Sequence, residues 1–270
     1  MDRKAWLGIV FTFLAVCLQA QPISSTSEIN GVAFDQTYLK SYPSQVFHLI
    51  KMPARFQTKD WVGVGVAASV FVGIYLTDRE IYTTIQRIEG SSETKRLGWT
   101  AAFGNGIVAL PTLVAMYVLN DQNQNPRARE AALAGLQSFI IGAGAAFAAK
   151  HLMHRPRPEQ LFDARYWQGP FHSFSYDAFP SGHSLRAFAT ATVIAGYYPD
   201  QPLVGLLGFT LAGLTAAGRL ESGDHWPSDV FAGAVIGYAI GRSIVHFNQY
   251  KSQKIQLSMD GNSVGLRLVF

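Results

Sequence analysis

Three short groups of residues, in a fixed order along the chain, carry side chains that could act on a phosphate group. They are Lys150 with Arg157-Pro158, then Pro180-Ser181-Gly182-His183, then Arg219 with His225 and Asp229. Lysine and arginine supply positive charge, the Ser-Gly pair supplies backbone amides, and histidines can transfer protons or attack phosphorus. By residue frequencies, a chance Pro-Ser-Gly-His in a chain of this length is roughly a one-in-a-thousand event. The ordered set therefore indicates a phosphate-handling active site.

The first group is expected to lie where a helix gives way to a loop. Lys150 closes a long apolar segment, and Pro156 and Pro158 follow it closely. Proline cannot continue a helix and disfavours helical geometry in the residue before it. We therefore expect Arg157 to be presented on a loop just beyond the helix.

The second and third groups are expected to begin helices. The amides around Ser181 and Gly182 then lie at a helix N-terminus, which binds phosphate readily, and glycine lets the phosphate approach the backbone. Pro227 suits the first turn of the last apolar helix. Asp229 follows it in that turn and could reach back to His225. This arrangement would give a histidine oriented by a carboxylate.

Composition favours a membrane protein. Of the 270 residues, 49% are apolar and only 15% are charged, whereas an average soluble domain has about 25% charged residues. The net charge is only +4, and no basic stripe with interleaved aromatic residues is present. Nucleic-acid binding therefore has little support.

The N-terminal 1–20 segment is expected to be a signal peptide or an N-terminal anchor. Arg3 and Lys4 precede an uncharged apolar run, and Ala20 offers a small residue for cleavage. Cys17 is best interpreted as an apolar residue of this run, with a lipoprotein acceptor site as the weaker alternative. Residues 21–60 are expected to form a polar lead-in, irregular apart from one short helix.

We predict an all-α fold, a helical bundle of about six apolar helices with a short C-terminal β-hairpin. The helical domain is expected at 61–249, with the catalytic groups at 150–229, and the hairpin tail at 250–270, around Asp260-Gly261. The apolar segments lie at about 61–77, 97–120, 131–149, 185–199, 201–218 and 227–247. The second, third and fifth run 24, 19 and 18 residues without a formal charge, which is long enough to span a membrane.

The three groups resemble the signature of the type 2 phosphatidic acid phosphatase and vanadium haloperoxidase superfamily. The family pattern is Lys-x6-Arg-Pro, Pro-Ser-Gly-His and Ser-Arg-x5-His-x3-Asp, and this chain departs from it only at Gly218, where the family has serine. The resemblance implies that His225 is the nucleophile, forming a phosphohistidine, that Asp229 orients it, and that His183 protonates the leaving oxygen. It further implies that no metal or other cofactor is needed, and that the phosphoryl oxygens are held by Lys150, Arg157, Ser181, Gly182 and Arg219.

On this resemblance the chain is expected to be a phosphoric ester hydrolase. We expect a phosphatase acting on a phosphate monoester or diphosphate of a lipid, such as phosphatidic acid, an isoprenyl diphosphate or a lipid A phosphate. Two alternatives remain open: a soluble periplasmic acid phosphatase of broad specificity, and a vanadate-dependent haloperoxidase. Detergent requirement and chain-length preference would separate the first two, and halide oxidation by peroxide would identify the third.

Other polar and aromatic residues near the groups match no motif position. Arg155 is interpreted as a loop or substrate-rim residue. Asp224 is interpreted as a polar surface residue, with a role in leaving-group preference as the weaker alternative. The aromatic residues of the loop could line an apolar path for the substrate or could pack the loop itself. They are Tyr166, Trp167, Phe171, Phe174 and Tyr176.

The expected membrane topology contains a conflict. Membrane-type relatives carry the site on the extracytoplasmic face, but a cleaved signal followed by three crossings would place Lys150 and Arg157 inside. Either 61–77 does not span, or the N-terminal segment is not a signal, or the bundle is soluble and periplasmic. We expect a membrane-embedded bundle in the cell envelope with its active site facing the periplasm, and a soluble periplasmic protein is the alternative.

Overall fold

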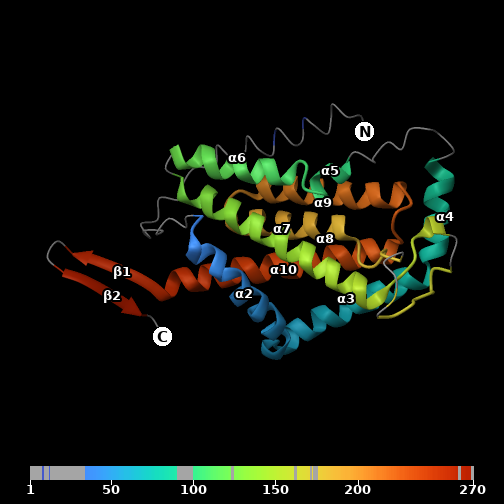
Figure 1. The fold of residues 1–270 in the computed structure, drawn as a ribbon, viewed down its shortest axis with the longest axis horizontal. Coiled ribbons are helices and arrows are strands. Elements are labelled where there is room, and N and C mark those ends of the chain that lie inside the picture. The colour runs from blue at the N-terminus through green and yellow to red at the C-terminus, as the bar shows by residue number, and fades with distance from the viewer. Residues whose placement is uncertain are drawn as a thin grey trace.

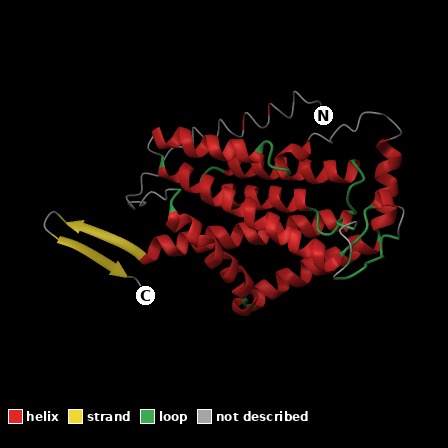
Figure 2. Ribbon diagram, in the orientation of Figure 1, coloured by secondary structure: helices red, strands yellow, loops and turns green. Residues whose placement is uncertain are grey.

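The structure, a computed structural model, is mostly helical, as the sequence predicts (Figures 1 and 2). It describes residues 34–89, 100–122, 125–160, 163–170, 172, 176–260 and 263–268, together with Gly8 and Thr12. The expected signal or anchor and the first part of the lead-in thus lie outside the described residues, apart from those two positions. The helices are α2 (Gln36–Lys51), α3 (Thr58–Leu76), α4 (Asp78–Glu89), α5 (Ala101–Gly104), α6 (Ala109–Gln122), α7 (Pro126–Met153), α8 (Gly182–Tyr197), α9 (Pro202–Glu221) and α10 (Pro227–Lys254), with 3-10 turns at Met52–Arg55 and Pro158–Gln160.

Helix α8 is the centre of the bundle and packs against α7, α9 and α10. Most of its side chains are buried. Two clusters of buried apolar residues meet on it, one shared with α6, α7 and α9 and one shared with α7 and α10. Beyond α10, the strands β1 (Ile255–Asp260) and β2 (Ser263–Leu268) pair antiparallel. Helix α10 runs to Lys254, so the hairpin begins at Ile255, five residues after the expected start of the tail at residue 250.

A row of glycines brings α10 into backbone contact with α8. Gly233, Gly237 and Gly241 recur every four residues, which places them on one face of α10. A Cβ at Gly237 would lie 2.2 Å from the carbonyl oxygen of Leu185, and one at Gly241 would lie 2.6 Å from that of Ala189. Small residues of this kind allow helices to approach closely where there is little hydrophobic driving force between them. The first turns of α8 and α10 are therefore held at a fixed separation.

Residues 97–120 do not form the single long helix that the sequence suggested. The described part of this segment contains the short helix α5, a turn, and then α6. At the turn, Gly106 has a φ of +97°, and a Cβ there would lie 2.8 Å from the ring of Phe139. Only glycine adopts this conformation readily. An uncharged run of residues thus met the length requirement without forming one continuous span.

Two amphipathic helices lie outside the six apolar segments. The lead-in was expected to be irregular apart from one short helix, and residues 36–51 of it form the 16-residue α2, which begins where the Asp35 carboxylate accepts the Tyr38 N–H at 2.8 Å. Residues 78–89 form α4, whose Tyr82 ring contacts the Trp226 ring at 5.5 Å between centroids. Gln86 Nε2 also donates to the Leu220 carbonyl at 3.1 Å. Helix α4 therefore covers one end of α9 and α10.

The described helices favour a membrane protein. Four of them, within Thr58–Leu76, Pro126–Gln160, Pro202–Glu221 and Pro227–Asn248, are long and apolar enough to cross a bilayer. Helix α3 is the clearest case, because none of its residues is buried in the bundle. An apolar helix without a single fully buried residue is stable only when an apolar solvent or a partner covers it.

Helix direction gathers the motifs at one end of the bundle. Helices α3, α7 and α9 finish at the end where α8 and α10 begin, which is the right-hand end in Figure 1. Hydrogen bonds cross between these ends, for example from the Ser181 N–H to the Asp229 carbonyl at 3.0 Å. The loops that join the helices at this end carry the remaining motif residues.

Candidate active site

The three predicted groups come together at this end of the bundle. Lys150 lies in the last turn of α7, and Arg219 lies in the last turn of α9. Ser181 is the N-cap of α8, and Asp229 is in the first turn of α10. Arg157 is on the loop after α7, as expected from the prolines around it. The local helix signals therefore placed Arg157, Ser181 and Asp229 correctly, whereas Arg219 of the third group ends α9 instead of beginning a helix.

Two of the cations are engaged by a carboxylate that the sequence analysis did not single out. Asp177 accepts hydrogen bonds from Arg157 Nε at 2.7 Å and from Arg157 Nη2 at 3.0 Å. Lys150 Nζ contacts the same carboxylate at 3.2 Å and also bonds the Asp177 carbonyl. Burial acts to raise the pKa of Asp177, but the hydrogen bonds from Arg157 and the charge of Lys150 outweigh it and lower that pKa to about 2. The carboxylate is therefore ionised at any ordinary pH.

The third cation pairs with a second carboxylate. Arg219 Nη1 lies 2.9 Å from Asp224 Oδ2, and Arg157 Nη1 lies 3.5 Å from Asp224 Oδ1. Asp224 is therefore part of the ion-pair network of the site, and its interpretation as a polar surface residue was wrong. Buried Arg219 Nε has no hydrogen-bond partner among the described residues. That donor is available to an oxygen of a bound ligand.

His225 is held by a backbone carbonyl. Its ring is buried, and Nδ1 lies 2.7 Å from the Ala178 carbonyl oxygen. A carbonyl oxygen can only accept, so Nδ1 carries the proton and Nε2 keeps its lone pair. Asp229 Oδ2 lies 4.0 Å from Nδ1, which is beyond hydrogen-bond distance. The expected hydrogen bond between Asp229 and His225 is thus replaced by one to the main chain.

Burial keeps both histidines neutral when no ligand is bound. Desolvation, followed by the charges of Lys150 and Arg157, lowers the pKa of His225 well below its usual value. Desolvation, followed by the charges of Arg219 and Arg186, lowers the pKa of His183 to about 4. A neutral His225 is suited to act as a nucleophile, and a His183 with a low pKa gives up a proton readily.

Asp229 is fixed by Arg155 and by the main chain. Its Oδ1 accepts from Arg155 Nη1 at 2.5 Å, and its Oδ2 accepts the Trp226 N–H at 2.9 Å. Arg155 lies on the loop after α7, as expected, but it is fully buried and is therefore not a substrate-rim residue. Nothing in the local sequence distinguished Arg155 from other loop arginines. Only its burial against two carboxylates from distant helices identifies it.

The aromatic loop after Arg157 packs onto α3. Trp167 Nε1 donates to the Tyr75 hydroxyl at 2.9 Å, and the Trp167 ring contacts Phe179 at 5.1 Å between centroids. Phe71 of α3 contacts Phe179 from the other side at 6.0 Å. For Trp167, loop packing is therefore the better interpretation. Phe171 and Phe174 lie outside the described residues.

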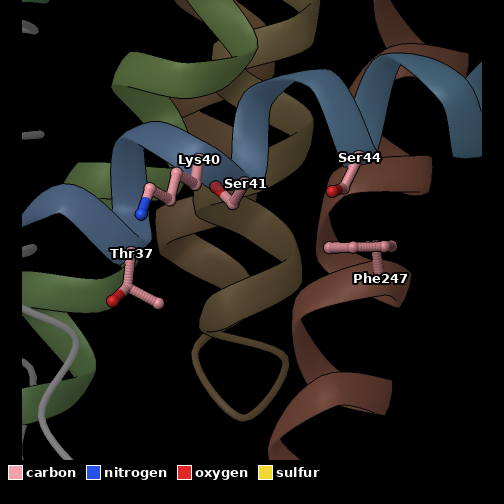
Figure 3. Close-up of a pocket in the computed structure, with 5 residues that line it drawn as sticks. All are labelled: Thr37, Lys40, Ser41, Ser44 and Phe247. Carbon is pink, nitrogen blue, oxygen red and sulfur yellow. The ribbon is translucent and has the colours of Figure 1, made fainter.

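A cavity at the other end of the bundle is separate from this site. Its volume is about 310 Å³, and its lining includes Lys40, Ser41 and Phe247 (Figure 3). Phe247 is 18 residues beyond Asp229 on α10, or about 27 Å at the rise of an α-helix. In the described part of the chain, no group of three His, Cys, Asp or Glu side chains is placed to hold a metal ion.

Comparison with known proteins relates the three motif groups to a protein family. Residues 131–253 match the family model described as the PAP2 superfamily. These residues form a PAP2 superfamily domain. The PAP2 domain extends from within α7 to within α10 and contains all three motif groups. The family resemblance inferred from the motifs is confirmed.

Individual relatives cover parts of the chain. A lipid A 1-phosphatase of Porphyromonas gingivalis is 38% identical over 66 residues, which are 24% of this chain and 15% of the relative. An undecaprenyl-diphosphatase of Sulfolobus acidocaldarius is 27% identical over 136 residues, which are 50% of this chain and 61% of the relative. The chain thus spans less than two thirds of either curated relative. A crystal structure of a transmembrane PAP2 type phosphatidylglycerolphosphate phosphatase from Bacillus subtilis matches with a TM-score of 0.46 and 16% identity, over 78% of this chain and 96% of that one.

Proposed function

We propose that the protein is a phosphatase that hydrolyses a lipid phosphate monoester or diphosphate through a phosphohistidine at His225. The observation that carries the proposal is the hydrogen bond from His225 Nδ1 to the Ala178 carbonyl, which leaves Nε2 as a free nucleophile. Lys150, Arg157 and Arg219 surround the same end of the bundle and supply charge for the phosphoryl oxygens.

The reaction proceeds in two steps. In the first, the Nε2 lone pair of His225 attacks phosphorus, the bond between phosphorus and the ester oxygen breaks, and His183, which takes up a proton when the anionic phosphate binds beside it, gives that proton to the departing oxygen. In the second, water attacks the phosphohistidine, His183 takes a proton from that water, and phosphate leaves. Ser181, the amide of Gly182 and the three cations hold the phosphoryl oxygens throughout. Asp229 contributes negative charge while His225 is positively charged.

A lipid substrate is supported by two kinds of observation. The curated relatives are named for lipid A and for undecaprenyl diphosphate. Four apolar helices of this chain are long enough to cross a bilayer. An enzyme embedded in this way meets lipid phosphates at the membrane surface. Embedding the enzyme would bring no such advantage for a water-soluble substrate.

The proposal includes an active site that faces the periplasm. Its bundle comprises about six apolar helices, counting α3, α5 with α6, and α7 to α10, with the C-terminal hairpin beyond it. With the catalytic end outside, the first turn of α3 lies on the cytoplasmic side. That placement favours an N-terminal segment that is not a cleaved signal, because cleavage would leave the new N-terminus outside.

Phosphate release and phosphoenzyme trapping test the proposal. The purified protein in detergent should release phosphate from lipid monophosphates or diphosphates, with rates that depend on chain length. Acid-labile phosphoenzyme should be trapped in the native protein and be absent in His225→Ala. Equal rates on short soluble phosphates without detergent would favour the soluble acid phosphatase. Bromination of a dye by the vanadate-loaded protein would favour the haloperoxidase, and competitive inhibition of phosphate release by vanadate would support the phosphatase.

A further inference from the structure

We propose that Asp78 is a positioning residue for this reaction, acting through Arg155 on the carboxylate of Asp229. The inference rests on the proposed function and adds a residue that lies outside the motif groups. Asp78 is the first residue of α4 and precedes the segment that matches the PAP2 superfamily, which begins at residue 131. The site of the PAP2 domain is thus completed by a part of the chain before that segment.

The two carboxylates share one guanidinium. Arg155 Nη2 donates to Asp78 Oδ2 at 2.7 Å, and Arg155 Nη1 donates to Asp229 Oδ1 at 2.5 Å. All three side chains have no exposed surface. The Arg155 guanidinium also lies 4.8 Å from the ring centre of Trp167. A charge network buried to this degree has one well-defined geometry, because any unpaired member would be strongly unfavourable.

Asp78 also holds the start of the helix that carries Asp229. It accepts the Ser228 N–H at 2.8 Å and the Ser228 hydroxyl at 2.5 Å. Ser228 is in the first turn of α10, where backbone N–H groups have no partner within the helix. Asp78 is therefore linked to Asp229 in two ways: through the hydrogen bonds of Arg155, and through its hydrogen bonds to Ser228, the residue before Asp229.

The net charge of the buried network explains what a second carboxylate contributes. Arg155 and Asp229 alone would form a neutral pair, whose electrostatic field would do little to stabilise positive charge on His225. With Asp78 included, the buried network carries a net charge of −1. His225 Nδ1 lies 4.0 Å from Asp229 Oδ2, so that charge acts on the imidazole when it becomes cationic on attacking phosphorus. Asp78 thus balances the positive charge of Arg155 and leaves Asp229 effective as a counter-charge for His225.

Steady-state kinetics of Asp78→Asn test this role, because asparagine keeps the shape and can still accept the Ser228 N–H. We expect kcat to fall about tenfold, the size of a partly lost electrostatic interaction in the transition state. KM and the inhibition constant of inorganic phosphate should stay within about twofold, because binding that is common to ground and transition states is unaffected. Asp60→Asn is the matched control: it removes an N-terminal helix carboxylate at the opposite end of α3 and should leave kcat unchanged.

A double-mutant cycle with Asp229→Asn separates this mechanism from a general loss of stability. If Asp78 acts through Asp229, the double variant should be no slower than Asp229→Asn alone, whereas independent effects would multiply. Multiplying losses, or a change in KM with kcat intact, would overturn the inference. An inactive native protein would instead refute the proposed function.

A second variant keeps the test decisive if Asp78→Asn does not fold. Arg155→Lys keeps the positive charge but cannot bond both carboxylates in the paired geometry of a guanidinium. We expect kcat to fall by a similar factor with the phosphate inhibition constant unchanged. Full kcat in folded Arg155→Lys would overturn the inference.

Discussion

Replacing Asp177 by asparagine should make the site bind phosphate more tightly. In the structure this carboxylate accepts two hydrogen bonds from Arg157 and lies 3.2 Å from Lys150 Nζ. These are cations expected to hold the phosphoryl group, so an entering phosphate competes with Asp177 for them. The pKa of Asp177 is lowered to about 2, and the competition therefore persists over the whole range in which the enzyme can be assayed.

The size of the effect follows from the exposure of these pairs. The Asp177 side chain is 34% exposed, so each ion pair contributes about 0.5–1 kcal/mol once screening by solvent is included. Releasing two cation side chains then favours a competing anion by about 1–2 kcal/mol, which is about five- to thirtyfold in affinity. Asparagine retains the shape of Asp177 and the carbonyl that Lys150 bonds, so only the charge is removed.

The assay is inhibition of lipid phosphate hydrolysis by inorganic phosphate and by vanadate. Both inhibition constants should fall in Asp177→Asn. Asp163→Asn is the control in the same loop, because its exposed carboxylate accepts only the Arg165 N–H in the described structure and should have no effect. Weaker inhibition in Asp177→Asn would refute the reasoning, since it would mean that Asp177 holds the cations in place for the substrate.

Three further changes should have measurable effects. Arg219→Ala should lower kcat/KM about a hundred- to a thousandfold, with partial recovery in a lysine variant, and full activity would remove Arg219 from the site. Because the pKa of His183 is lowered to about 4 in the empty site, its acid form is lost as pH rises, so turnover of alkyl phosphates should decline on the alkaline side of the profile. His183→Ala should abolish that limb and slow alkyl phosphates far more than an activated aryl phosphate, and equal losses on both would contradict its role as the acid. Gly237→Ala should destabilise the protein by about 2 kcal/mol or more because its Cβ would meet the α8 backbone; thermal unfolding in detergent checks this against Gly213→Ala, which has open space.

The sequence was most informative where chemistry and helix ends coincide. Pro158 and Pro227 mark the correct boundaries around Arg157 and Asp229, because proline restricts the local backbone whatever the tertiary context. The apolar segments for α7, α9 and α10 also match the helices found. The length of the uncharged run at 97–120 wrongly predicted one continuous helix. Gly106 turns the chain there, and a count of uncharged residues cannot detect the conformation of a single residue.

The residues that sequence analysis missed are those whose partners are distant in the chain. Asp78 and Arg155 are 77 residues apart, and Asp177 lies 20 residues from Arg157. In the sequence, a single charged residue on a loop cannot be told from one that is solvated at the surface, because only the fold shows what it is buried against. Burial, and hence the strength of an ion pair, is a property of the assembled bundle and has no local pattern.

The glycine row on α10 also has a consequence for how such an enzyme can diversify. Because the α8 backbone touches α10 at Gly237 and Gly241, His183 on one helix and His225 just before the other move together as a unit. Neither helix can be exchanged for that of a relative without its counterpart, whereas α3, which carries none of the site residues, can vary separately. Recombination between relatives should therefore alter substrate range at α3 while the distance between the two histidines is inherited intact.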